Sequence, residues 1–146
     1  MEDIFKKDLA GEMVSPHEPG YDLLINTIWE TMKLANELNT GYHSPEEVRS
    51  YMTRITGRPI DPSVTVLPPF YVDYGKNIRF GKRCWIQQGC TFFDRGGITL
   101  GDDVFLAPKV NLITINHAPD PDNRSATYGR PIVIEDKAWI GINATI

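Results

Sequence analysis

His117 stands where the sequence changes character, in the stretch NLITINHAPDPDNRSATYGRPIVI at residues 111–134. Histidine ordinarily titrates close to neutral pH, so a histidine held at the edge of a structured segment can act as a general base. The alternative is a loop histidine whose ring does no more than bind a backbone carbonyl. His117 directly follows a β-type run and is one of 3 histidines in the chain. This position favours the general base.

The residues around this stretch repeat with a period of six. An apolar residue recurs at every sixth position, apart from two longer intervals, at Phe80, Ile86, Phe92, Leu100, Leu106, Leu112, Ile134, Ile140 and Ile146. A unit of six residues cannot bury a core alone, so successive units must stack. The repeat predicts a mainly β fold, a parallel β-helix whose triangular coil takes three units, roughly 18 residues. An antiparallel sandwich is the alternative, but a sandwich would not keep one phase through all of these units.

The two longer intervals locate insertions in the repeat. The interval of 8 residues after Phe92 contains two extra residues, within residues 94–97. The interval of 22 residues after Leu112 contains about 16 residues beyond one unit. These residues, at about 113–131, are predicted to leave the coil as a turn-rich loop that carries His117. A loop of this length in a compact solenoid is more often functional than idle.

The first part of the chain has a helical period instead. Apolar residues recur at helical spacing in three short segments of residues 1–58, the helical N-terminal segment. The third segment begins where Ser44 can cap a helix and Glu47 can complete a capping box, and Gly57 is a natural stop. Three short helices bury little surface by themselves, so this segment is expected to pack against the β-helix, residues 59–146.

Length, composition and charge limit the function classes. With 146 residues, of which 41% are hydrophobic, the chain is expected to form one ordinary globular domain with at most a small appendage. A net charge of −4 and scattered basic residues predict neither a nucleic-acid nor a membrane partner, and the cytoplasm is the expected compartment. Cys84 and Cys90 are interpreted as small core residues.

Four segments carry a resemblance to a known family: PPFYVDYGKNIRFG, ITLGDDVFLAPKVNLIT, NHAPDPDNR and GRPIVIEDKAWIGINATI. Together with LAGE near the start, they resemble the maltose and galactoside O-acetyltransferase branch of the hexapeptide-repeat acyltransferases, whose fold is a left-handed β-helix. The resemblance spans almost the whole chain. It implies a homotrimer with active sites between neighbouring β-helices. It also implies acetyl-CoA as the donor and a hydroxyl of a sugar-like acceptor.

The same resemblance assigns roles to single residues. His117 matches the family's catalytic histidine, which takes the proton from the acceptor hydroxyl. Gln87 stands where the family usually has an asparagine that helps to hold the acceptor or the oxyanion. Acceptor contacts are implied for Asp73, Trp85, Asp94 and Arg95. Because Arg95 replaces an acidic residue of the galactoside-type enzymes, the resemblance does not predict a plain galactoside as the acceptor. The beginning of the CoA groove is implied for Trp139, Gly141 and Ile142.

Alternatives to an active enzyme remain open. Family members continue for several hexapeptides beyond the AWIG unit, whereas this sequence ends at Ile146. The chain is therefore expected to be a C-terminally shortened member, whose CoA half is largely absent. The alternative function is a catalytically weak or inactive trimeric β-helix that serves as a binding or structural module. Other acyltransferases share the fold. Zinc enzymes of the carbonic anhydrase type share it too, but zinc needs three imidazole ligands, and no metal is expected here.

Overall fold

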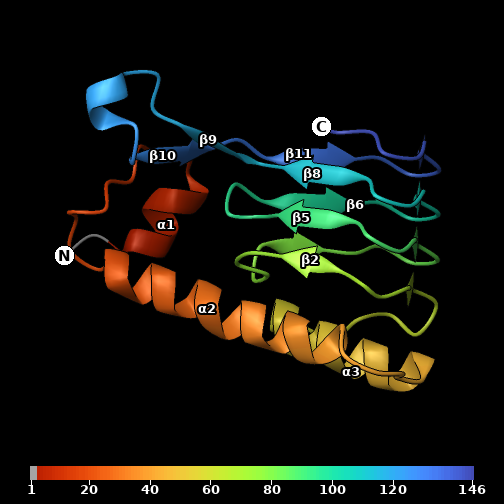
Figure 1. Cartoon of the computed structure of the whole chain (residues 1–146). Helices are drawn as coiled ribbons and strands as arrows, with labels where there is room; N and C mark the ends of the chain where they lie inside the picture. The colour runs from red at the N-terminus through yellow and green to blue at the C-terminus, as the bar shows by residue number, and fades with distance from the viewer. Residues whose placement is uncertain (1–2) are drawn as a thin grey trace.

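The computed structural model describes residues 3–146, in which three α-helices come before the strands (Figure 1). They are α1 (Ile4–Leu9), α2 (Tyr21–Leu38) and α3 (Pro45–Thr56), and they confirm the three segments expected from the apolar spacing. The capping box of α3 is present, since Ser44 and Glu47 each accept a hydrogen bond from the other's backbone N–H. Gly57 ends α3 in the left-handed conformation, at φ 68°. No helix within residues 3–146 is long and apolar enough to span a membrane.

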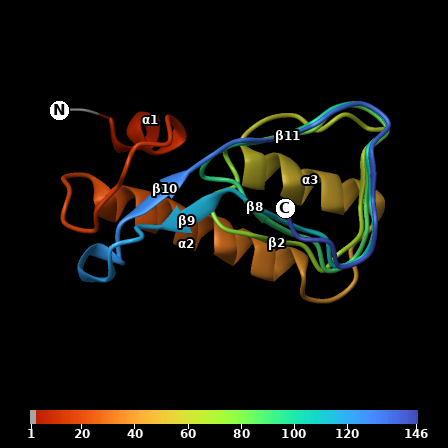
Figure 2. The same cartoon turned by 90° about the horizontal axis from the view of Figure 1, so that it is seen from above.

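The strands that follow form three parallel sheets, one along each side of a triangular coil (Figure 2). The first side consists of β1 (Thr65–Val66), β4 (Trp85–Ile86), β7 (Phe105–Leu106) and β12 (Trp139–Ile140). The second side consists of β2 (Tyr71–Val72), β5 (Thr91–Phe93) and β8 (Asn111–Ile113). The third side consists of β3 (Ile78–Arg79), β6 (Ile98–Leu100) and β11 (Ile132–Ile134). The fold is the left-handed β-helix that the repeat and the resemblance predict, which confirms the fold class.

The strand register follows the predicted repeat positions. Ile86 pairs with Leu106, and Leu106 pairs with Ile140 in the next coil. Val66, Ile86 and Leu106 are successive partners 20 residues apart. The first coils therefore hold two residues more than the roughly 18 expected from three hexapeptides.

The extra residues of successive coils lie at one corner, between the second and third sides. Residues 73–77 join β2 to β3, and residues 94–97, where the sequence predicts an insertion, join β5 to β6. In the next coil the chain leaves this corner as the antiparallel hairpin of β9 (Ile115–His117) and β10 (Thr127–Gly129). The short 3-10 helix η1 (Pro121–Asn123) forms its tip. The excursion expected at about 113–131 thus contains an ordered hairpin rather than an irregular loop.

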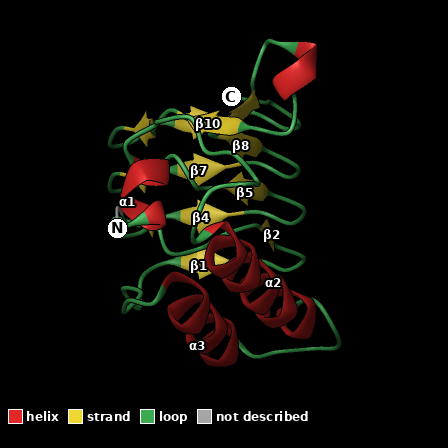
Figure 3. Ribbon diagram, turned by 90° about the vertical axis from the view of Figure 1, so that its left-hand side faces the viewer, coloured by secondary structure: helices red, strands yellow, loops and turns green. Residues whose placement is uncertain are grey.

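Helices and coil share one hydrophobic core. Leu38, Met52 and Ile55 of the two longer helices are fully buried in the same cluster as Ile86 and Leu106 of the coil. α2 and α3 lie across the end of the coil that begins at β1 (Figure 3). Their apolar faces close the first turn of a solenoid that would otherwise expose its interior.

Both cysteines are part of this core, as interpreted from the sequence. Cys84 and Cys90 are free and buried. Burial raises the pKa of each thiol, which disfavours the reactive thiolate. Their contribution is packing within the coil.

Candidate active site

His117 is the last residue of β9, and its side chain is exposed. Its ring atom Nδ1 lies 2.7 Å from the backbone carbonyl oxygen of Arg124, across the hairpin. A carbonyl accepts and cannot donate, so Nδ1–H is the donor, and in the neutral ring Nε2 keeps its lone pair. The contact with a carbonyl is what the loop-histidine alternative also predicts. The unengaged, exposed Nε2 is what a general base needs in addition.

The tip of the hairpin is closed by polar contacts of its own. The Asp120 carboxylate accepts a hydrogen bond from the Asp122 N–H at 3.0 Å. The Arg124 guanidinium donates to the backbone carbonyl of Pro119 at 3.1 Å. These contacts hold the Arg124 carbonyl, which in turn orients the His117 ring.

Asp73 and Asp94 meet at the corner from which the hairpin leaves. The Asp94 N–H donates to Asp73 Oδ1 at 3.0 Å, and the Asp94 carboxylate accepts from the N–H groups of Gly75 and Asn77 at 2.7 and 2.9 Å. Burial, together with the negative charge of Asp73, raises the pKa of Asp94 to about 8, although the two backbone donors oppose this shift. Asp94 is fully buried, whereas Asp73 is partly exposed. Asp73 is therefore the carboxylate that can reach a ligand, and Asp94 orients it.

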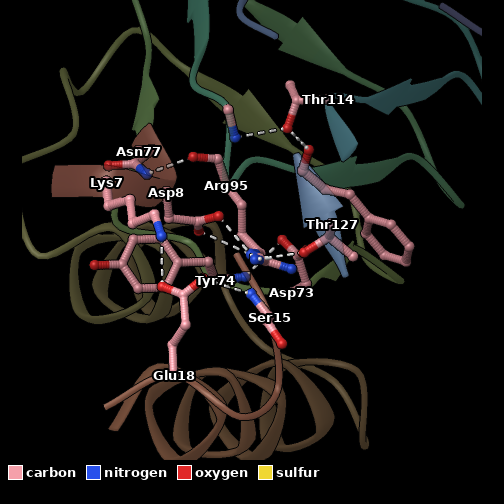
Figure 4. A network of polar contacts seen from close by, with 12 residues as sticks. Lys7, Asp8, Ser15, Glu18, Asp73, Tyr74, Asn77, Arg95, Thr114 and Thr127 are labelled. Carbon is pink, nitrogen blue, oxygen red and sulfur yellow. Dashed lines mark hydrogen bonds and ion pairs between the residues drawn. The ribbon is translucent and has the colours of Figure 1, made fainter. Parts of the chain in front are cut away.

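Arg95 follows Asp94, but its guanidinium reaches the N-terminal helix (Figure 4). Nε and Nη2 donate to the two carboxylate oxygens of Asp8 at 2.8 and 2.7 Å, and Nη2 also donates to Thr127 Oγ1 at 3.0 Å. Arg95 is 6% exposed and Asp8 is 2% exposed, so water is largely excluded from this ion pair.

Sequence reasoning missed Asp8 and Thr127. Asp8 and Arg95 are 87 positions apart in the chain, so no local pattern joins them. A signal was available in α1, where Asp8 lies four residues after the buried Ile4 and so on the same, inward face of the helix. A carboxylate on an apolar face calls for a buried cation as its partner.

Trp85, Gln87 and Trp139 belong to the first side of the coil. Phe105 pairs with both tryptophans, so the three aromatic side chains stack in one column across β4, β7 and β12. With Gln87, they line an open groove of about 390 Å³. Trp139 is 79% exposed. An apolar column of this kind at the surface marks a place for a ligand or a partner chain.

Gly141 and Ile142 follow β12 at the next corner. A Cβ atom built at Gly141 would meet nothing within 4 Å. Ile142 is 69% exposed.

The predicted site residues thus form two groups on opposite sides of the triangle. His117, Asp73, Asp94 and Arg95 lie at or next to the corner between the second and third sides. The groove of Trp85, Gln87 and Trp139 belongs to the first side, which lies opposite that corner (Figure 2). The packed core of the coil separates the two groups, so one chain does not bring them together. Within residues 3–146, no cluster of three or more His, Cys, Asp or Glu side chains is arranged to hold a metal ion.

Several known proteins are similar to the chain in sequence, although no model of a protein family matches it. Nodulation protein L of Rhizobium meliloti is 34% identical over 145 residues, which cover 97% of this chain and 76% of that protein. Galactoside O-acetyltransferase of Escherichia coli is 30% identical over 115 residues, which cover 77% of this chain and 57% of that protein.

Solved structures are similar in fold as well. A hexapeptide-repeat-containing acetyltransferase of Vibrio cholerae matches with a TM-score of 0.80 at 30% identity, over 96% of this chain and 76% of that chain. A Vibrio cholerae protein of the same description, in complex with acetyl coenzyme A, matches with a TM-score of 0.73 at 24% identity, over 99% of this chain and 84% of that chain.

Proposed function

Because this chain belongs to the hexapeptide-repeat acetyltransferases of the maltose and galactoside branch, we propose that it acetylates a hydroxyl of a sugar or sugar-like acceptor with acetyl-CoA. The Escherichia coli relative is named for this reaction on galactosides, and a structure similar in fold contains acetyl coenzyme A. Within the chain itself, the observation that carries the proposal is the exposed His117 ring, whose Nδ1–H is committed to a carbonyl and whose Nε2 faces outward as a base.

Acetyl transfer needs a base for the acceptor hydroxyl and a hydrogen-bond donor for the negative charge that develops on the thioester carbonyl oxygen. His117 Nε2 takes the proton from the acceptor hydroxyl while the hydroxyl oxygen attacks the thioester carbonyl carbon. The new C–O bond forms, the C–S bond breaks, and His117 returns the proton to the departing sulfur. General-base assistance of this kind is worth about 10²–10⁴-fold in rate. The Gln87 amide donates a hydrogen bond to the carbonyl oxygen as negative charge develops on it.

The remaining residues bind the two substrates. Asp73 accepts hydrogen bonds from acceptor hydroxyls, with Asp94 orienting its carboxylate, and Trp85 packs against the apolar face of the sugar ring. Arg95 makes no contact with the acceptor, because its guanidinium is held by Asp8 and Thr127. Trp139, Gly141 and Ile142 line the beginning of the CoA groove. The support for this division is the exposure of the aromatic column on the first side of the coil.

The site is proposed to form between copies of the chain in a homotrimer. What supports this is the separation of His117 from Gln87, which lie on opposite sides of one coil. A head-to-tail interface brings the corner of one copy against the first side of the next, and such an interface closes into a ring. Three copies then make three equivalent sites. A cytoplasmic location is part of the proposal, because acetyl-CoA is available there.

The direct test is release of the CoA thiol from acetyl-CoA in the presence of a panel of mono- and disaccharides and their glycosides. Acceptor-dependent release by the wild-type chain, with formation of an O-acetyl sugar seen by mass spectrometry, is the expected result. Calorimetric titration with acetyl-CoA is the companion measurement. Binding of a sugar or of acetyl-CoA without any transfer would favour the alternative, a trimeric binding module.

A further inference from the structure

We propose that Asp8, Arg95 and Thr127 form a buried clamp that positions His117 through the β9–β10 hairpin. The inference rests on the proposed role of His117 and deepens it. In this arrangement the N-terminal helix is part of the catalytic apparatus, and Arg95 acts as a positioning residue.

The clamp begins with a rigid ion pair. The Arg95 guanidinium makes a two-pronged contact with the Asp8 carboxylate, at 2.8 and 2.7 Å, in a site from which water is largely excluded. Such a fork fixes the direction of the arginine side chain as well as its position. The backbone of the same segment is tied to the neighbouring coils, since Asn77 Nδ2 donates to the Arg95 carbonyl at 3.0 Å and the Gly96 N–H donates to Thr114 Oγ1 at 2.9 Å (Figure 4).

The clamp then reaches the hairpin through one side chain. Arg95 Nη2 donates to Thr127 Oγ1 at 3.0 Å, and Thr127 is the residue that pairs with His117 in the β9–β10 register. On its other edge, Thr127 exchanges two backbone hydrogen bonds with Val14, at 2.8 and 2.9 Å. β10 is therefore held between the strand of the base and the N-terminal segment.

The hairpin depends on this clamp because it lies outside the core of the coil. The side chains of β9 are partly or fully exposed, so little packing fixes their place. Thr127 is 7% exposed and faces the protein interior. A base must lie within hydrogen-bond reach of the hydroxyl it deprotonates, and a misplacement of about 1 Å can cost about 100-fold in rate.

The test compares Thr127→Val, Asp8→Asn and Arg95→Lys with the wild-type chain. Thr127→Val keeps the shape of the side chain and removes the oxygen that Arg95 binds. Arg95→Lys keeps the charge but cannot reproduce the fork. Two quantities are measured: amide hydrogen exchange of residues 115–129, and the separate values of kcat and of KM for the acceptor. The matched control is Asp103→Asn, which removes an equally short, exposed fork between Arg83 and Asp103 at another corner of the coil.

In the three clamp variants, we expect faster exchange in the hairpin and a kcat lowered by about 10- to 100-fold, with the acceptor KM within about twofold of wild type. Asp103→Asn should change neither the amide exchange of the hairpin nor kcat. Unchanged hairpin exchange in Thr127→Val would overturn the clamp, since that variant is not expected to perturb the fold. A raised acceptor KM with normal kcat in Arg95→Lys would also overturn it, because it would indicate direct contact of Arg95 with the acceptor. If the wild-type chain transfers no acetyl group, the proposed function fails, while the exchange measurement still decides whether the clamp holds the hairpin.

Discussion

His117 is exposed and nevertheless has a fixed orientation. Its Nδ1–H is directed to a carbonyl of its own hairpin, and this leaves Nε2 as the basic atom. His17 differs, since it lies in the N-terminal part of the chain and its backbone N–H donates a hydrogen bond to the Ser15 hydroxyl at 3.3 Å. The chemistry open to a histidine therefore depends on which of its two ring nitrogens already makes a hydrogen bond.

Replacing His117 by alanine should lower kcat by about 10²–10⁴-fold, because the base is lost. The coil should remain folded and acetyl-CoA should still bind, since the ring lies outside the core. Steady-state kinetics and calorimetric titration measure the two effects. His17→Ala is the control and should keep wild-type activity. Near-normal turnover in His117→Ala would show that another group removes the proton.

The carboxyl pair Asp73 and Asp94 should make the free energy of unfolding depend on pH. Because the pKa of Asp94 is raised to about 8, the folded chain keeps a proton that an unfolded carboxyl loses near pH 4. The folded state binds more protons across this window, so the free energy of unfolding should fall as pH rises from about 4 to about 8. Asp73→Asn removes the repelling charge and should reduce this fall. Urea unfolding at pH 5 and pH 8 measures the free energy of unfolding of the wild type and of Asp73→Asn. An equal decrease in the two proteins would contradict an effect of Asp73 on the pKa of Asp94.

Among the elements, α3 owes its limits to local signals. Ser44 and Glu47 satisfy each other's backbone donors at its start, and Gly57 supplies the left-handed residue at its end. The hairpin differs, because its position comes from the contacts of β10 with α1 and Val14, far away in sequence. Local signals thus set the ends of α3, whereas the hairpin takes its position from distant partners.

Ser44→Ala should lower the free energy of unfolding by about 1 kcal/mol, because the cap of α3 loses its side-chain acceptor. Ser50→Ala is the matched control, an exposed serine inside the same helix. It should leave stability unchanged or raise it slightly, since alanine favours helices. Chemical denaturation followed by circular dichroism measures both variants. Equal effects of the two substitutions would show that the capping box does not stabilise the fold.

For the whole molecule, the triangular cross-section of the coil decides how the two groups of predicted site residues are placed. It places the corner from which the β9–β10 hairpin leaves opposite the first side of the coil (Figure 2). His117 belongs to that hairpin, and the groove with Gln87 and Trp139 belongs to the first side. Under the proposed function, one copy of the chain therefore presents two halves of a site that face in different directions. Association of copies in a ring would join each corner to the groove of a neighbour.

This arrangement predicts complementation between inactive variants. His117→Ala and Gln87→Ala should each be nearly inactive alone, but when the two are refolded together, some interfaces combine an intact His117 with an intact Gln87. Random mixing in a ring gives about a quarter of the wild-type activity. A site built within one copy would show no recovery. The oligomeric state of each variant and of the mixture is checked by light scattering.

The sequence by itself determined the coil and the place where it is interrupted. Ile86 and Phe92 lie six residues apart, as do Leu100 and Leu106, and this period indicates burial directly, because side chains that point inward must be apolar in every unit. The same phase located the excursion that carries His117. The two extra residues within 73–77 are outside this prediction, because they come before Phe80, the first residue of the predicted repeat.

Tertiary structure alone decided how the functional side chains are oriented and grouped. It directs Arg95 to Asp8 and Thr127, links the N-terminal helix to the hairpin, and separates His117 from Gln87 by the width of the core. These relations join residues that are far apart along the chain. Spacing within a repeat encodes which side chains are buried, but it does not encode which distant partner a buried charge will meet, because that depends on how the elements pack.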